Sequence, residues 1–244
     1  MLLSQPNFIK KEKIMGLYDR NYTNNAQFAN EAIAERDSAL VNFVKTTYKF
    51  FGASLFFAFI GAMIGFMYLE FVVEYRLFIF IAEIAALFGV MFSRSKPGLN
   101  IAMLFIFTTL TGLAITPLVA MVAFKAGAGA VAMAFAMTTI IFGVMSIFGI
   151  KTTKDLANMG KMLFIALIVV VVCSIINLFL GSSMFQVLIS SAAAILFSLY
   201  VAYDTQNIVR GLYTSPVDAA INLYLDFYNI FVSLLSLIGL ANRD

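Results

Sequence analysis

Three acidic side chains lie inside long apolar runs of this sequence: Glu83, Asp204 and Asp226. The other ten of the thirteen Asp and Glu residues lie in polar tails or at the ends of the apolar runs. An ionisable side chain inside a membrane-spanning run is costly to bury, so it is by default a candidate for function. The stretch "SLYVAYDTQNIVRG", which holds Asp204, is the clearest case.

Asp204 and Asp226 are expected to lie at similar depths in a membrane. Asp204 comes six residues before Arg210, where one apolar run ends, and Asp226 comes eight residues after Asp218, where the next run begins. At the rise of an α-helix these separations are roughly 9 Å and roughly 12 Å. A short loop joins the two runs, so their helices should pack antiparallel. This arrangement places both carboxyl groups in the inner half of the bilayer.

The chemistry of such a pair follows from its charge. Two carboxylates close together in a medium of low dielectric constant are costly to ionise at once, so one takes a proton and the pair titrates as a unit. Carboxylate oxygens are also ligands that Ca²⁺ accepts readily, so Asp204 and Asp226 form a possible Ca²⁺ site. The chain has no histidine, which leaves this pair as its obvious pH switch.

Two further charged residues lie on the run that precedes "SRSKPG". Arg94 follows the inner end of this run, and Glu83 comes eleven residues earlier, roughly 16 Å higher on the same helix. Eleven residues are about three helical turns, so Glu83 and Arg94 share a helix face.

A stripe of polar residues follows the last apolar run. Its members recur at steps of 4, 3, 4 and 3 and are Asn222, Asp226, Asn229, Ser233 and Ser236. This spacing puts them on one helix face, which must meet protein or water because lipid offers no hydrogen-bond partners. The stripe is either the wall of an ion or water path or a set of hydrogen bonds between helices.

The elements that position these residues are membrane spans. The chain is 62% hydrophobic and 12% charged, far more apolar than a soluble domain, and its mean hydropathy is +0.95. We predict an all-α protein with a polar cytoplasmic tail over residues 1–46, whose start is Met1 or Met15, and a seven-helix transmembrane domain over residues 47–244. The tail is expected to hold at most one short amphipathic helix. The predicted spans are Tyr48–Tyr68, Arg76–Phe92, Leu99–Phe124, Ala128–Ile150, Met162–Leu180, Met184–Ile208 and Ala219–Leu240.

The basic residues indicate the orientation of these spans. With the N-terminus inside, thirteen of the sixteen Lys and Arg residues lie on the inner side, and Arg76, Lys125 and Arg243 lie outside. This distribution favours seven spans with a cytoplasmic N-terminus and an external C-terminus. Six spans with a re-entrant last segment would move only Arg243, so that alternative stays open. Gly61 and Gly65 form a GxxxG motif in the first span, which predicts close helix packing rather than a dimer.

Several segments in the right order resemble the Bax inhibitor-1 (transmembrane Bax inhibitor motif) family, in its bacterial branch. "SLYVAYDTQNI" and "INLYLDFYNIFVSLLSLIG" are similar to the closing segments of that family. "VKTTYKFFGASLFFAFIGAMIG" resembles its first span, "AEIAALFGVMFSRSKP" its second, "TGLAITPL" its third and "KTTKDLANMGKML" the loop into its fifth. The resemblance covers about residues 40–244.

The resemblance implies seven helices with a central helix ringed by the others. It also implies a pH-dependent Ca²⁺ leak that is gated by Asp204 and Asp226, with Arg94 as the basic residue that latches the closed state and Glu83 as an acidic residue higher in the pore. The ending "YNIFVSLLSLIGLANRD" resembles members that modulate the membrane protease FtsH. The main hypothesis is therefore a Ca²⁺ leak channel, and the alternative is a regulator of a membrane protease.

An enzyme is not expected. Two intramembrane aspartates are typical of one class of protease, but Asp226 lies in "YLDFYN" and lacks the flanking glycine which that class uses. We expect no cofactor apart from Ca²⁺ as a permeant or bound ion, and no nucleic-acid partner. The expected protein is a monomer in the bacterial inner membrane, with lipid, Ca²⁺ and a membrane protease as candidate partners.

Overall fold

The computed structural model describes the backbone from Asn7 to Ala241 and the side chains of residue 28 and residues 30–241. Every regular element in this part of the chain is a helix. The chain divides into two units, the first ending at Phe43 and the second beginning at Val44. The second unit holds all the candidate site residues.

The N-terminal region differs from its prediction. One helix, α1, runs from Asn7 to Met67, where the sequence indicated at most a short helix before the first span. The physical reason lies in the composition, because no Gly or Pro occurs between Gly16 and Gly52, and Ala, Glu, Gln and Arg in this region favour helix. The described side chains from residue 30 to residue 39 are exposed, and they include charged residues as well as apolar ones such as Ile33.

The remaining helices agree with the predicted spans to within three residues at each end. They are α2 (Leu69–Glu74), α3 (Arg76–Phe92), α4 (Pro97–Ala126), α5 (Ala128–Lys151), a 3-10 turn (Ala157–Met159), α6 (Gly160–Leu180), α7 (Ser183–Val209) and α8 (Pro216–Ala241). Only the short α2 and the 3-10 turn have no counterpart among the predicted spans. The boundaries follow from the polar, Gly and Pro breaks between the apolar runs.

Six helices of the described chain are long and apolar enough to cross a membrane: α4 to α8 and the stretch Asn30–Met67 of α1. The one predicted span outside this set is the second along the chain, Arg76–Phe92, which forms α3. Its 17 residues lie at the lower end of the lengths that span a bilayer. The structure thus supports a multi-pass membrane protein with six candidate spans, and the count of seven stays a prediction.

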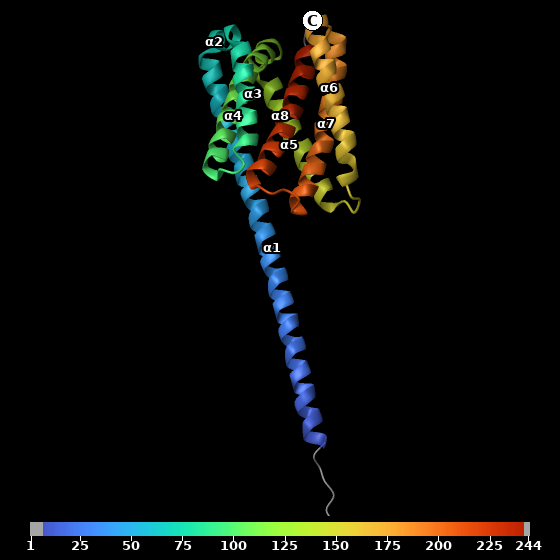
Figure 1. Ribbon diagram of the computed structural model, residues 1–244. Helices are drawn as coiled ribbons and strands as arrows, with labels where there is room; N and C mark the ends of the chain where they lie inside the picture. Colours follow the sequence, from blue (N-terminus) through green and yellow to red (C-terminus); the bar gives the residue numbers. More distant parts are fainter. Residues whose placement is uncertain (1–6, 242–244) are drawn as a thin grey trace, which may run out of the picture. The chain divides into compact units, whose positions relative to one another are not determined.

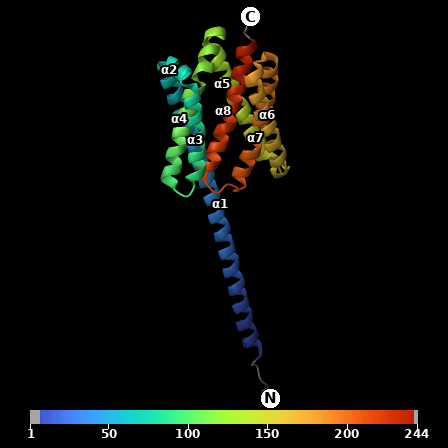
Figure 2. The same ribbon diagram turned by 45° about the horizontal axis from the view of Figure 1, so that its top comes forward.

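Helices α3 to α8 lie side by side in the second unit (Figures 1 and 2). Helix α8 packs against α4, α5 and α7, and fourteen of its residues are buried. Small residues allow close approach, since a Cβ atom added at Gly149 of α5 would collide with the backbone of Ala202 in α7. A Cβ atom at Gly61 of α1 would likewise collide with the backbone of Thr109 in α4. The GxxxG motif therefore packs within the chain.

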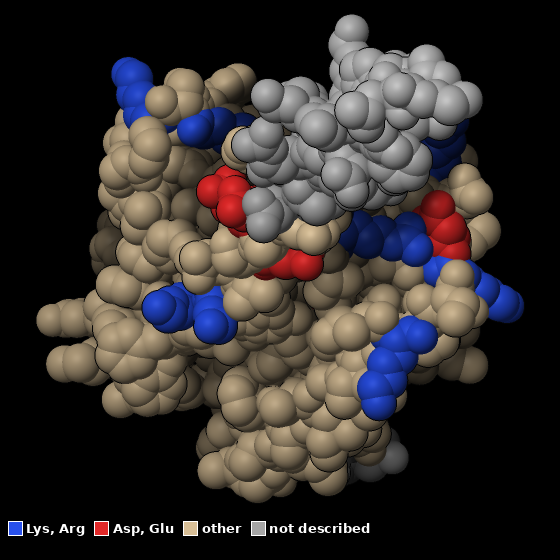
Figure 3. Space-filling view, turned by 90° about the horizontal axis from the view of Figure 1, so that it is seen from below, with Lys and Arg blue, Asp and Glu red and all other residues tan. Residues whose placement is uncertain are grey.

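One end of the bundle carries the α3–α4, α5–α6 and α7–α8 connections (residues 93–96, 152–159 and 210–215), and we call it the basic end. Figure 3 shows Lys and Arg side chains spread over this end. Six exposed basic residues lie in or beside these connections: Arg94, Lys96, Lys151, Lys154, Lys161 and Arg210. In the described residues from 69 to 241, the only other basic residues are Arg76 and Lys125.

Candidate functional site

The structure brings Asp204 of α7 and Asp226 of α8 together. Their side chains lie close enough to interact electrostatically. Both residues are buried, at 5% and 3% exposure. Two buried carboxyl groups at such separation are costly to ionise at once. The antiparallel packing of α7 and α8 brings the two residues together, and their role as a gate stays a prediction.

Tyr213 closes the pair on the side of the basic end. Its hydroxyl donates to Oδ1 of Asp204 at 2.8 Å and accepts from Nδ2 of Asn222 at 3.0 Å. Burial and the Asp204 carboxylate raise the pKa of the Tyr213 phenol above its usual range, so the hydroxyl keeps its proton and remains a donor. Tyr213 therefore ties the α7–α8 connection to both helices.

Sequence analysis did not identify Tyr213 as a site residue. The sequence does offer one local indication of its role. Tyr213 lies in a six-residue connection between two aspartate-bearing spans, so few hydrogen-bond partners are within reach of its hydroxyl. The turn that aims it depends on Gly211, whose φ of +67° lies in the left-handed region that glycine favours. The backbone N–H of Leu212 then donates to the carbonyl of Asn207 at 2.9 Å and ends α7.

Asp226 has an unused oxygen. Its Oδ2 atom is buried and has no hydrogen-bond partner among the described residues. Leaving a buried acceptor unpaired costs roughly 1–3 kcal/mol, so this oxygen is free to take a proton or a cation. No cluster of three or more potential metal-ligating side chains exists in the described part of the chain. A Ca²⁺ ion here would need further oxygen donors beyond the pair, because it takes six to eight.

Arg94 lies elsewhere than expected. Its Nε atom donates to Oδ1 of Asp218 at 3.0 Å, in the first turn of α8, and not to either member of the pair. The Arg94 side chain is 57% exposed, whereas that of Asp218 is 8% exposed. Asn100 fixes the preceding turn by donating to the carbonyl of Val90 at 2.8 Å. The expected counter-charge for the pair is thus a partner of Asp218 in this structure.

Glu83 is also separate from the aspartate pair. It is a half-buried residue of α3 and lies close enough to Tyr224 and Tyr228 of α8 to interact with them electrostatically. The hydroxyls of these two tyrosines bond to Thr111 of α4, that of Tyr224 through the threonine hydroxyl and that of Tyr228 through the carbonyl at 3.4 Å. Glu83 therefore lies within electrostatic range of this second polar contact, on a helix that packs against α4.

The polar stripe of α8 divides into two parts. Asn222 belongs to the Tyr213 network, whereas Asn229 donates to the carbonyl of Leu225 at 2.7 Å and Ser233 to that of Asn229 at 2.6 Å. The last member, Ser236, is half-buried. Asn229 and Ser233 thus donate to carbonyls of their own helix, and hydrogen bonding between helices stays a prediction for the stripe. The other interpretation, a polar wall, stays a prediction.

Comparison with known proteins supports the resemblance seen in the sequence. The family model described as Inhibitor of apoptosis-promoting Bax1 matches residues 40–243. An uncharacterized protein of Helicobacter pylori is 63% identical over 231 residues, which are 94% of this chain and all of the relative. A Campylobacter jejuni protein is 45% identical over 93% of this chain and 99% of its own length. The Escherichia coli protein named Modulator of FtsH protease YccA is 33% identical over 169 residues, 67% of this chain and 76% of its own.

Proposed function

Because the chain belongs to the Bax inhibitor-1 family, we propose that it is an inner-membrane protein that regulates a membrane protease of the FtsH type. The observation that carries this proposal is its similarity to the E. coli modulator of FtsH, which extends over two thirds of the chain. Regulation of this kind needs a surface that meets the protease rather than a catalytic group, so the proposed protein is not an enzyme.

The N-terminal region is the proposed contact element. The family match begins at residue 40, so the segment before it is additional to the shared membrane bundle. The described side chains from residue 30 to residue 39 are exposed along the helix and include Glu31, Glu35 and Arg36. An exposed helical stretch that carries charges offers a partner both ionic contacts and backbone that local unfolding can release.

Co-purification tests this proposal. The full chain and a chain lacking residues 1–40 are co-expressed with the membrane protease of the same organism, and the degradation rate of a membrane substrate is measured. We expect the full chain to bind the protease and slow degradation, and the shortened chain to lose both effects while it keeps the thermal unfolding of the membrane bundle. Equal binding and equal degradation rates for the two chains would overturn the role of this segment, and no binding by either would overturn the function.

The buried carboxyl pair favours a second candidate function, a pH-sensitive Ca²⁺ leak. Asp204 and Asp226 are buried close together, and Tyr213 donates to Asp204 from the connection at the basic end. Protonation would remove negative charge from the path, whereas Ca²⁺ would favour the ionised pair. Glu83 and the α8 stripe (Asn222, Asn229, Ser233 and Ser236) would then line the route, and release of Arg94 from Asp218 would open it.

Flux measurements separate this candidate from the first. Ca²⁺ flux into proteoliposomes is recorded between about pH 6 and pH 8, the range in which a perturbed carboxyl pair can change its charge. Asp204→Asn and Asp226→Asn are expected to change the size and the pH dependence of the flux. Asp155→Asn, an exposed acid at the basic end, is the matched control and should leave both unchanged. A flux that the pair variants do not alter would contradict the leak.

We further propose that α3 crosses the bilayer, which gives seven crossings with the N-terminus inside, the C-terminus outside and α8 at the centre. The concentration of exposed Lys and Arg at the basic end supports a cytoplasmic position for that end. The orientation of these crossings is tested with single cysteines at Lys125 and Lys154, in a chain whose own Cys173 is replaced by serine. We expect a membrane-impermeant thiol reagent to label the Lys125 position in intact spheroplasts and the Lys154 position only after lysis. The reverse labelling pattern would show that the basic end faces outward, which would contradict the proposed orientation.

A further inference from the structure

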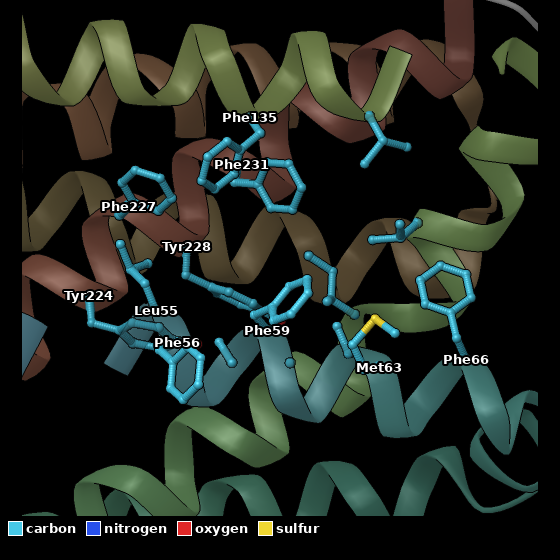
Figure 4. Close-up of a pocket in the computed structure, with 16 residues that line it drawn as sticks. Leu55, Phe56, Phe59, Met63, Phe66, Phe135, Tyr224, Phe227, Tyr228 and Phe231 are labelled. Carbon is cyan, nitrogen blue, oxygen red and sulfur yellow. The ribbon is translucent and has the colours of Figure 1, made fainter. Parts of the chain in front are cut away.

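A cavity of about 530 Å³ opens among α1, α4, α5 and α8, apart from the carboxyl pair (Figure 4). Its wall on α1 runs from Leu55 to Phe66, and its wall on α8 runs from Tyr224 to Phe231. Phe135 of α5 covers it from the opposite side. All the lining residues belong to helices that are long and apolar enough to cross a membrane.

The chemistry of the cavity excludes a polar occupant. Its lining consists of aliphatic and aromatic side chains and one glycine, and its only side-chain hydroxyls are those of Tyr224 and Tyr228. Both of these hydroxyls bond to Thr111 and are therefore already paired. A bound water needs two to four polar partners and an ion needs more, so neither is stable in such a space.

The cavity opens toward the hydrocarbon of the bilayer. Residues that line it on α1 and α5 are also largely exposed: Phe56 and Phe59 at 60%, Met63 at 50%, Phe66 at 44% and Phe135 at 50%. Exposed apolar side chains in the middle of spanning helices face lipid. Lipid acyl chains are thus the molecules that surround the mouth of the cavity, and they carry no polar group that would need a partner.

The length of the cavity fits one leaflet. The twelve residues from Leu55 to Phe66 span roughly 16 Å along α1, and half of the hydrocarbon core of a bilayer is about 15 Å thick. The stretch also lies in the last turns of α1, which ends at Met67, so it belongs to the leaflet far from the basic end. A single acyl chain from that leaflet would extend along the whole cavity.

We propose that this cavity is a binding site for one acyl chain of a membrane phospholipid from the leaflet opposite the basic end. Burial of the chain against aromatic rings supplies van der Waals contacts that an empty cavity would lack. The occupant would contact Tyr224, Phe227 and Tyr228, which flank Asp226 in the sequence of α8, and would so hold α8 in place. This site does not depend on either function proposed above.

Photo-crosslinking in liposomes tests the proposal. The full-length protein is reconstituted in phosphatidylethanolamine and phosphatidylglycerol with a trace of phosphatidylethanolamine that carries a diazirine in the middle of one acyl chain. Labelled peptides are mapped by mass spectrometry. We expect the label to concentrate on residues 55–66 and on Phe135 and Phe231, well above the level on the exposed apolar face of α6. Labelling of α6 at the same level would mean ordinary contact with bulk lipid and would overturn the site.

Cavity-filling variants sharpen the test. Val119→Phe and Val131→Phe place a ring in the cavity, and Val169→Phe makes the same change on the exposed face of α6, where the valine is 54% exposed. A loss of about 1.4 kcal/mol of binding corresponds to about a tenfold fall in labelling, which we expect for the filling variants and not for the control. Unchanged labelling in a folded filling variant would contradict the proposal.

A second measurement applies even if both filling variants fail to fold. The wild-type protein, extracted in a mild detergent, is analysed by native mass spectrometry. We expect one phospholipid to be retained after the remaining lipids are removed, and its exchange for a lysophospholipid with one chain of similar length. Retention of no lipid, or of a free fatty acid or detergent alone, would count against a phospholipid site.

Discussion

The hydroxyl of Tyr213 donates a hydrogen bond to Asp204 at 2.8 Å, and this contact joins the α7–α8 connection to the buried carboxyl pair. Asn222 donates to the same hydroxyl, so three residues from α7, the connection and α8 form one network. The network therefore lies between Asp204 and the α7–α8 connection at the basic end.

Tyr213→Phe is expected to destabilise the protein and to open the pair. The change leaves Oδ1 of Asp204 without its donor, and a lost hydrogen bond to a charged group costs roughly 1.5–3 kcal/mol. We expect a lower thermal unfolding temperature in detergent and, if the protein conducts, a larger Ca²⁺ flux. Tyr68→Phe, at an exposed tyrosine, is the control for loss of a hydroxyl. Equal unfolding temperatures for Tyr213→Phe and the wild type would show that the contact contributes nothing.

The ion pair between Arg94 and Asp218 is expected to be weak and specific. Arg94 is more than half exposed, so solvent screens the interaction and a coupling free energy of about 0.5–1 kcal/mol is expected. A double-mutant cycle with Arg94→Gln and Asp218→Asn, followed by thermal unfolding, measures it. The matched cycle with Arg94→Gln and Asp204→Asn should give almost no coupling. A larger coupling in the second cycle would place Arg94 on the carboxyl pair.

The sequence predicted the bundle well because its information is local. Polar, Gly and Pro breaks end the apolar runs, and the short α7–α8 connection makes Asp204 meet Asp226 at similar depth. The long α1 was missed, although the absence of Gly and Pro from residue 17 to residue 51 permits it. That region lacks the apolar stripe that marks a buried helix, so a pattern based on hydrophobicity has no signal there.

The partner of Arg94 depends on a longer-range relation. Resemblance and charge directed Arg94 to the aspartate pair, but the choice between acids depends on the depth and rotation of α3 relative to α8. Arg94 follows the end of α3 at the basic end, and Asp218 lies in the first turn of α8 at the same end. Asp226 is about two turns deeper in α8. A partly exposed arginine gains most from the acid at its own level, since deeper insertion would remove its charge from water.

The pH dependence of the contact between Asp155 and Arg210 has a defined direction. A hydrogen bond from the N–H of Ala157, at 3.0 Å, and the contact with Arg210 lower the pKa of Asp155 below its usual value of about 3.9. A lowered folded-state pKa gives stability that is complete above the unfolded pKa and is lost as the pH falls through the folded pKa. The contribution of Asp155 is therefore constant at neutral pH and disappears only in strong acid.

Thermal unfolding of the wild type and of Asp155→Asn from about pH 8 to about pH 3 measures this contribution across the titration of an ordinary carboxyl group. The difference between the two unfolding temperatures should be small, because the side chain is exposed, and constant above about pH 5. It should shrink as the pH falls toward the acid end of this range. A difference that changes between pH 6 and pH 8 would mean that Asp155 titrates in the range assigned to the buried pair.

Gly112 is expected to tolerate no side chain, because α1 and α4 touch there. A Cβ atom at Gly112 would overlap the backbone carbonyl of Ala58, so Gly112→Ala must force the two helices apart. We expect the free energy of unfolding to fall by roughly 1–3 kcal/mol or more, which is typical of overpacking.

Gly129→Ala is the matched control, since no atom lies within 4 Å of its added Cβ. Replacing that helical glycine should be neutral or stabilise by up to about 1 kcal/mol. Urea or thermal unfolding in detergent compares the two variants, and similar stabilities would show that α1 and α4 do not pack as closely as the structure indicates.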